Sequence, residues 1–513
     1  MSKRALIIAA TLLLWLGAMG WLVFFEAYPE LRHQTATGYQ TLLSHGVMIM
    51  DRWMTLSFQG RPIGYTHTSV DVDEQNGRTQ YRINNRTILT LSIMGSRQRV
   101  AVNADAVVDA LYRLISFSFD LTSTGYAISV DGTKKHDNVF DITIKGVGSS
   151  QHFTVTIPEN AVIYSPMTEM ALKSLNPGGR AILQIFNPVT LSSQTVTVRA
   201  LRREPLHHAG TTINTTVLTA TVDGMETLSW IDRDGLVVRQ ETSLGWTLER
   251  CAAQEALAAG ARQGSEDMLT TLAVPITGDR ALLNSATAVT LRLTGPTFTP
   301  EALQSQRQTV ISLHSNVTDV LVRSDALPVG GCNKMATPPA LTPWLASTPF
   351  VQANDQRLIN KAREITGAWT NSLDAALAIY QWVFTQVAKK PTVSLPSALD
   401  VLARPEGDCN EHTYLFAGLA RAAGLPCKIR VGLTLHEGQF YYHAWPSVYV
   451  GQWLDMDPTR GLPAVNTGYL SLLEGELAEQ MKLMSIVGKL KVEIIGTGSR
   501  IQDSGSRMNT TGR

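Results

Sequence analysis

The sequence predicts an α+β protein, with antiparallel β domains first and then a domain in which helices precede another sheet. Between residues 50 and 250, runs rich in Val, Ile, Thr and Tyr are separated by turn signals, and polar and apolar side chains alternate. This alternation is typical of antiparallel sheets with one solvent-facing side. From residue 354 the apolar spacing becomes helical, and strand-like runs return at Lys428. A chain of 513 residues has room for roughly two to four domains.

Residues 1–30 are predicted to form a transmembrane anchor. Residues 5–25 carry no charge, and this uncharged run is long enough for a helix to span a bilayer core. Lys3 and Arg4 precede the span, so the positive-inside rule places the N-terminus in the cytoplasm and exports the remainder. A cleaved signal peptide is the alternative, although no small-residue cleavage site follows the apolar run.

Residues 45–265 are predicted to form an antiparallel β domain, and residues 270–349 a small β region followed by a Pro-containing linker. In the first of these, the clearest turn signals are Asn76-Gly77, Asp131-Gly132, Asn176-Pro177-Gly178, Asp223-Gly224 and Asp234-Gly235. No nucleophile and base occur together in this region, so we expect a scaffold or binding role for it.

Residues 350–480 are predicted to form the domain that carries the chemistry. Asn354 precedes a first helix, Asn371 can cap a second, and residues 397–402 make a short third. Residues 481–513 are predicted to be a C-terminal extension with a disordered end, because the sequence after Thr497 is polar and rich in Gly and Ser.

The composition excludes several classes of function. Lys and Arg number 44 and Asp and Glu 43, so there is no basic surplus and no nucleic-acid partner is expected. The cysteines show no CxxC spacing, and we expect no metal and no cofactor. An oxidising compartment permits a disulfide between Cys251 and Cys332, although spacing alone does not fix the pairing.

Cys409 is the candidate nucleophile. Asp408 is a good cap residue, and apolar positions recur helically from Cys409 until Gly424 and Pro426 end the helix. The cysteine therefore lies in the first helical turn. Free backbone N–H groups and the helix dipole favour an anion there, so we expect the pKa of the thiol to be lowered toward a reactive thiolate.

His443 and Asp457 are the candidate partners of this cysteine. His443 lies on a strand predicted from residue 440, and Asp457 follows the next strand and precedes Pro458. If the helix packs on the face that bears His443, the thiol, imidazole and carboxylate converge, with Cys409 attacking a carbonyl. His443 then moves the proton, and Asp457 holds the ring. Asp455, on the same face of an extended strand, competes for the role of Asp457.

Four sequence blocks in order resemble the transglutaminase-like superfamily, in its bacterial membrane-anchored type. They are residues 407–412 (GDCNEH), 421–426 (RAAGLP), 443–445 (HAW) and 457–459 (DPT). The resemblance covers roughly residues 350 to 480 and implies a papain-like core. It also implies that Cys409, His443 and Asp457 form the catalytic triad.

Asn410 departs from the animal cross-linking enzymes, many of which carry Trp at that position, and no acidic calcium loop is evident. The resemblance thus supports the triad better than it supports cross-linking. The expected function is thiol-dependent acyl transfer or hydrolysis on protein or peptide carboxamides. A periplasmic cysteine protease or amidase of the same fold is one alternative, and a non-catalytic membrane-anchored adaptor is another.

The expected location is the bacterial inner membrane, with a single span and the C-terminal domains facing the periplasm. The expected partners are a protein or peptide substrate in the cell envelope and the membrane itself. For the oxyanion hole, the Cys409 backbone N–H is a natural donor. The sequence leaves the second donor open. His412, one turn after Cys409, is interpreted as a helix-surface or supporting residue.

Overall fold

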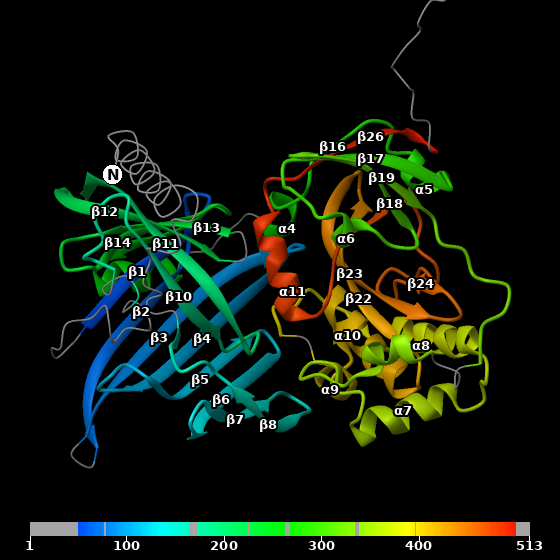
Figure 1. Ribbon diagram of the computed structural model, residues 1–513, viewed down its shortest axis with the longest axis horizontal. Helices are drawn as coiled ribbons and strands as arrows, with labels where there is room; N and C mark the ends of the chain where they lie inside the picture. The colour runs from blue at the N-terminus through cyan, green and yellow to red at the C-terminus, as the bar shows by residue number, and fades with distance from the viewer. Residues whose placement is uncertain are drawn as a thin grey trace, which may run out of the picture.

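The computed structural model describes residues 50–75, 78–163, 168, 172–222, 225–261, 267–333, 338–395 and 397–498. The fold is mixed α+β. Figure 1 shows a large curved sheet on one side of the molecule and, on the other, a smaller sheet covered by helices with a further sheet beside it.

The large sheet has 15 strands in the order β8-β7-β6-β5-β4-β3-β2-β1-β15-β14-β13-β12-β11-β10-β9. Its halves join where β1 pairs with β15, and β9 pairs parallel with β10 while the other pairs are antiparallel. The strands are β1 (Met50–Phe58), β2 (Arg61–Gln75), β3 (Arg78–Ile93), β4 (Ser96–Asp109), β5 (Leu114–Ser123), β6 (Tyr126–His136), β7 (Val139–Lys145), β8 (Ser150–Thr156), β9 (Ala161–Ile163), β10 (Arg180–Asn187), β11 (Ser192–His208), β12 (Thr211–Val222), β13 (Met225–Ile231), β14 (Val237–Thr242) and β15 (Trp246–Cys251).

One of the predicted turns in this sheet is wrong. Asp131 and Gly132 lie inside β6, where Gly132 faces Phe117 on β5. A Cβ atom on Gly132 would lie 2.2 Å from the Phe117 ring, so the glycine leaves room for an aromatic side chain. The turn at Asp234-Gly235 is confirmed, with Gly235 at a φ of 84°. The signals at residues 76–77 and 223–224 lie outside the described residues.

A second, five-stranded sheet has the order β16-β26-β17-β19-β18. Its last strand in sequence, β26, lies between β16 and β17, so the chain leaves this sheet after β19 and returns to its interior. The elements of this region are α3 (Ala253–Ala261), α4 (Met268–Thr271), β16 (Ile276–Thr277), α5 (Leu282–Ser285), β17 (Ala288–Thr294), α6 (Pro300–Leu303), β18 (Gln308–His314), β19 (Val317–Arg323) and β26 (Lys491–Thr497).

The segment between β19 and β26 forms the third part, a four-stranded sheet in the order β24-β23-β22-β25 with helices packed on it. Figure 1 shows α7, α8, α9 and α10 gathered at this sheet. The elements are η4 (Pro339–Leu345), α7 (Gln356–Thr366), α8 (Ser372–Gln386), β20 (Ala388–Lys389), α9 (Ala398–Ala403), β21 (Glu406–Gly407), α10 (Cys409–Ala422), β22 (Cys427–His436), β23 (Gln439–Tyr449), β24 (Trp453–Asp455), β25 (Tyr469–Glu474), α11 (Leu477–Met481) and η5 (Lys482–Ser485).

The helix starts follow the predicted caps closely. The Asn371 side chain accepts hydrogen bonds from the N–H groups of Leu373 and Asp374 at the start of α8. Asp355, one residue after the expected Asn354, caps α7 instead. Such side-chain oxygens satisfy N–H groups that have no partner inside the helix.

The predicted location in the bacterial inner membrane is contradicted. Among the described residues, none of the helices has both the length and the apolar character needed to cross a bilayer. The segment on which the prediction rested, residues 5–25, lies outside the described part of the chain, as does the predicted disordered end at residues 499–513. The permitted disulfide is also absent, because all four cysteines are described and free.

Candidate active site

Cys409 is the first residue of α10, and a capping box fixes its position. The Asp408 side chain accepts the Asn410 N–H at 3.1 Å, and the Glu411 side chain accepts the Asp408 N–H at 2.8 Å. Gly407, at a φ of 153°, lets the chain enter this turn, since a Cβ atom there would lie 2.2 Å from the Glu411 side chain. The capping box therefore holds the backbone on both sides of the cysteine.

His443 and Asp457 are directly hydrogen bonded. The Nε2 atom of His443, on β23, lies 2.7 Å from Oδ2 of Asp457, which follows β24. Asp457 is fully buried and His443 is 8% exposed. With Nε2 bonded to the carboxylate, Nδ1 is the ring nitrogen that remains for a proton from another group.

Asp457 is held as a carboxylate by several donors. Besides the His443 ring, the Tyr469 hydroxyl donates to Oδ2 at 2.6 Å, and the N–H groups of Thr459 and Arg460 donate to Oδ1 at 2.8 and 3.0 Å. Burial raises the pKa of Asp457, but the nearby His443 and these hydrogen bonds outweigh it and lower the pKa to about 2.

The Cys409 sulfur lies beside the backbone of the residue that follows His443. The Ala444 N–H donates to this sulfur. That N–H lies along a part of β23 that β24 leaves unpaired, because β24 pairs only with Ser447, Val448 and Tyr449. A buried histidine–carboxylate pair and a cysteine at a helix start thus meet at one edge of the sheet.

The expected activated thiolate is wrong for the resting protein. Burial raises the pKa of the Cys409 thiol well above its ordinary value, and the carboxylates of Asp408, Glu411 and Asp457 add to the rise. The Ala444 N–H opposes this effect without reversing it. The position at a helix start is as predicted, but burial, together with the neighbouring acidic groups, raises the pKa of the thiol there.

The comparison with known proteins addresses the same stretch of chain. The model of the transglutaminase-like superfamily matches residues 359–458. The chain carries a transglutaminase-like domain.

Three solved structures resemble parts of this chain. A putative cysteine protease from Cytophaga hutchinsonii is 17% identical with a TM-score of 0.31, covering 40% of this chain and 86% of that one. The periplasmic domain of TgpA from Pseudomonas aeruginosa is 15% identical with a TM-score of 0.25, covering 36% and 92%. A beta-barrel-like protein of unknown function from Brucella abortus is 9% identical with a TM-score of 0.31, covering 40% and 95%. Among curated proteins, none matches the sequence.

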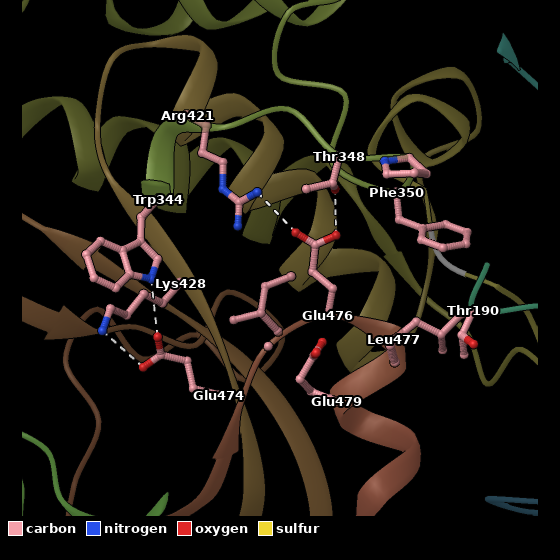
Figure 2. Close-up of a pocket in the computed structure, with 14 residues that line it drawn as sticks. Thr190, Trp344, Thr348, Phe350, Arg421, Lys428, Glu474, Glu476, Leu477 and Glu479 are labelled. Atoms are coloured by element: carbon pink, nitrogen blue, oxygen red, sulfur yellow. Dashed lines mark hydrogen bonds and ion pairs between the residues drawn. The ribbon is translucent and has the colours of Figure 1, made fainter. Parts of the chain in front are cut away.

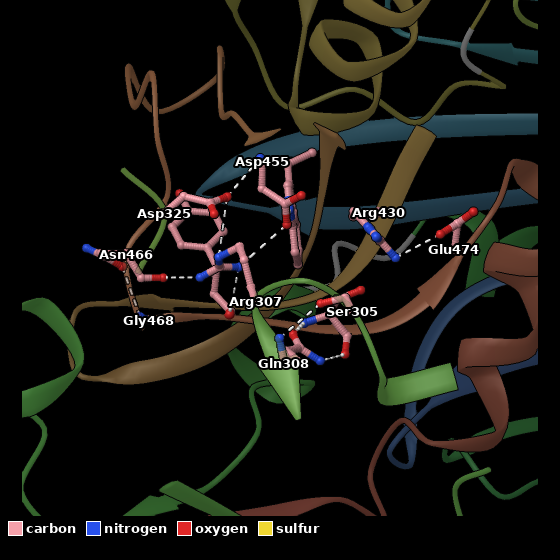
Figure 3. Close-up of polar contacts among 12 residues, drawn as sticks. Ser305, Arg307, Gln308, Asp325, Arg430, Asp455, Asn466, Gly468 and Glu474 are labelled. Atoms are coloured by element: carbon pink, nitrogen blue, oxygen red, sulfur yellow. Dashed lines mark hydrogen bonds and ion pairs between the residues drawn. The ribbon is translucent and has the colours of Figure 1, made fainter. Parts of the chain in front are cut away.

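Asp455, the competing candidate of the transglutaminase-like domain, has different partners. Its Oδ2 accepts the Trp445 Nε1–H at 3.0 Å, and the fully buried Trp445 stacks beside His443 with 6.2 Å between ring centroids. Figure 3 shows Arg307 lying between Asp455 and Asp325, with each ion pair at 3.5 Å. Asp455 therefore holds Trp445, which stacks beside His443, and does not bind the His443 ring.

Asp325 and Asp455 are two buried acids that share one arginine. Asp325 accepts the Asp455 N–H at 2.9 Å. Burial and the charge of Asp455 outweigh the attraction of Arg307 and raise the pKa of Asp325 to about 7. Arg307 also donates to the carbonyl of Asn466 at 2.6 Å, so it connects the second sheet to the loop before β25.

Sequence reasoning missed Tyr469, Arg307 and Asp325. Tyr469 lies beyond the matched segment. Arg307 precedes β18 and Asp325 follows β19, both more than a hundred residues before Asp457. No motif spacing marks them. The one available signal is the charge of Arg307 directly before β18.

His412 is buried one turn after Cys409. Its Nδ1 lies 2.7 Å from the Asp408 carbonyl, and burial lowers its pKa. It is thus a neutral supporting residue behind the capping box and not the helix-surface residue that the sequence allowed.

A cavity of about 390 Å³ lies elsewhere, where the transglutaminase-like domain and the segment after β25 meet Thr190. Figure 2 shows two ion pairs in its lining, Arg421 with Glu476 and Lys428 with Glu474. Lys428 also lies over the rings of Trp344 and Trp453, at 4.2 and 4.5 Å. Cys409, His443 and Asp457 are not among its lining residues, so its size does not make it part of the candidate active site.

Proposed function

We propose that the protein is a thiol enzyme that transfers or hydrolyses the acyl group of a protein or peptide carboxamide. Cys409 is the nucleophile, His443 the acid–base group and Asp457 the residue that orients the ring. The observation that carries the proposal is the buried 2.7 Å contact between His443 Nε2 and Asp457 Oδ2, next to a cysteine sulfur bonded by Ala444.

The raised pKa of Cys409 favours a general-base mechanism. As the sulfur attacks the carbonyl carbon, its proton passes to Nδ1 of His443, and the Asp457 carboxylate stabilises the resulting imidazolium. The imidazolium then protonates the leaving amine, and the C–N bond breaks to leave a thioester on Cys409. An amine or water, deprotonated by His443, attacks the thioester and releases the thiol.

The backbone supplies part of the stabilisation of the tetrahedral intermediate. The N–H of Cys409 belongs to the first turn of α10, where N–H groups have no partner within the helix. Such a donor can bind the developing oxyanion, and the loss of one donor typically costs about 3 kcal/mol of transition-state stabilisation.

The test uses a peptide that contains glutamine, with a primary amine as acceptor. Wild-type protein is expected to form a Cys409 thioester detectable by mass spectrometry, to release ammonia, and to incorporate the amine or form the acid. Cys409→Ala and His443→Ala should lower turnover by on the order of 10⁴-fold or more. Cys332→Ala, which removes a half-buried cysteine elsewhere, is the matched control.

The acceptor that is used decides between transferase and hydrolase chemistry. Incorporation of the amine indicates transfer, and formation of the acid alone, or cleavage of a peptide bond, indicates a hydrolase. If Cys409→Ala retains wild-type turnover, the enzyme proposal is wrong. A non-catalytic adaptor that uses this fold then becomes the better interpretation.

A further inference from the structure

A short extended segment lies between the large sheet and the start of α10. This segment, residues 391–395, is called the strap here. It follows β20, which pairs in parallel with β21, and β21 ends two residues before Cys409. The Lys390 N–H donates to the Gly407 carbonyl at 2.9 Å. The strap is thus attached to the strand that leads into the candidate nucleophile.

Alternate carbonyls of the strap accept hydrogen bonds from the large sheet. The donors come from β4, β5 and β6, and an extended chain presents every second carbonyl to the same side. The bonds are Gln98 Nε2 to Pro391 O at 3.1 Å, Ser123 Oγ to Val393 O at 2.7 Å, and Tyr126 OH to Leu395 O.

The intervening residues of the strap contact the capping box instead. The Ser394 hydroxyl donates to the Glu411 carboxylate, and the Thr392 N–H donates to the Asp408 carboxylate. Because successive residues of an extended chain face opposite sides, one segment contacts the large sheet and the turn around Cys409 at the same time.

We infer that Ser123 and Tyr126 of the large sheet are positioning residues for Cys409. They hold the strap, the strap holds Asp408 and Glu411, and these two residues fix the first turn of α10. Neither residue touches Cys409, His443 or a reacting atom in this scheme. The inference rests on the proposed role of Cys409 as nucleophile, and it makes the large sheet part of the active-site structure.

A second contact joins the same two parts of the molecule independently of the strap. The Asp400 carboxylate, on α9, accepts the Gly148 N–H at 3.0 Å and the Ser149 hydroxyl at 2.8 Å. The loss of the strap bonds therefore leaves the large sheet attached. An effect on Cys409 can then be separated from detachment of the sheet.

The test compares full-length wild-type protein with the double variant Ser123→Ala/Tyr126→Phe. We expect kcat to fall about 10- to 100-fold with little change in KM, because a displaced nucleophile slows chemistry more than binding. The rate of Cys409 alkylation by iodoacetamide should also change, measured by mass spectrometry with Cys251 and Cys332 in the same sample as references. Ser123→Thr, which keeps the hydroxyl, should retain wild-type kcat.

The matched control is Ser118→Ala/Tyr65→Phe. Ser118 lies on the same strand as Ser123 but bonds Asp105, and Tyr65 packs against Gly260. This control should leave both the alkylation rate and kcat unchanged. Equal alkylation rates and equal kcat in the double variant and the control would overturn the inference. If Cys409→Ala keeps full turnover, it is the proposed function that is wrong. The alkylation comparison needs no substrate, so it still tests whether Ser123 and Tyr126 position Cys409.

Discussion

Asp457 is the residue whose environment makes the sharpest pH prediction. Its pKa is about 2 in the folded protein against an ordinary value of 3.8, so the folded state favours the carboxylate. The resulting stabilisation, about 2 kcal/mol, is present above roughly pH 4 and is lost as the pH falls toward 2. Urea unfolding from pH 6 to pH 2 should show this loss in wild-type protein and not in Asp457→Asn. Equal pH slopes for the two proteins would contradict it.

Cys409 makes a second prediction at this scale. Because the pKa of its thiol is raised, its alkylation by iodoacetamide in the absence of substrate should keep increasing above pH 9. A thiolate–imidazolium pair would instead give fast alkylation already at neutral or acidic pH. Mass spectrometry of the modified peptide against pH distinguishes the two, and an early plateau would show that the resting thiol is ionised.

The candidate residues of the site were predictable to different degrees. Cys409, His443 and Asp457 stand in short blocks with helix and strand signals around them, so their types and approximate places follow from the sequence. The pKa of Cys409 was mispredicted, because the burial that raises it most depends on how the whole domain packs. The charges of Asp408, Glu411 and Asp457 also raise it, although the sequence suggested only a capping role for Asp408.

The capping box of α10 carries a prediction at the scale of elements. Glu411→Ala leaves the Asp408 N–H and the Ser394 hydroxyl without their acceptor, which should cost about 1–3 kcal/mol of unfolding free energy. The same change should lower turnover, because it loosens the turn that holds Cys409. Urea denaturation and steady-state kinetics measure the two effects.

Asn371→Ala is the matched control, because it removes the cap of α8 and should cost about 1 kcal/mol while turnover stays near wild type. If Glu411→Ala and Asn371→Ala affect stability and turnover alike, the capping box has no special connection to the nucleophile.

Helices and strands were predicted better than the features that join them. Asn371, Ser397 and Asp408 cap helices as their side-chain chemistry predicts. Asp131-Gly132 misled because Asp-Gly is a turn signal by local preference, whereas this glycine is required by a ring on the neighbouring strand. The residues around Asp131 do not show that Phe117 of β5 will lie against this glycine.

At the scale of the whole molecule, Arg307 connects the second sheet to the site. Arg307→Met removes the arginine that forms ion pairs with both Asp325 and Asp455, which should destabilise the protein by about 3–5 kcal/mol in urea unfolding. Adding Asp325→Asn should recover part of this loss, because it removes one of the two charges.

Arg292→Met is the control for this prediction. Arg292 pairs with Asp319 in the same sheet, but its side chain is 42% exposed, so its loss should cost at most about 1 kcal/mol. A comparable cost for both arginines, or no recovery in the double variant, would show that Arg307 does not act as the shared counter-charge.

The arrangement of the whole chain was the least predictable level. The predicted small β region at residues 270–349 and the predicted extension from residue 481 contribute strands to one sheet. Likewise, the pairing of β1 with β15 joins strands nearly two hundred residues apart. Each pairing depends on which strand edges meet in the folded chain. The periodicity of a short stretch of sequence does not predict this.

The inner position of β26 has a consequence for biosynthesis. Lys491–Thr497 lies between β16 and β17, although those two strands are made about two hundred residues earlier. During translation the nucleophile and its partners therefore emerge from the ribosome before the sheet that presents Arg307 can close. A nascent chain that ends before β26 therefore contains every residue of the candidate triad, but its five-stranded sheet lacks an inner strand.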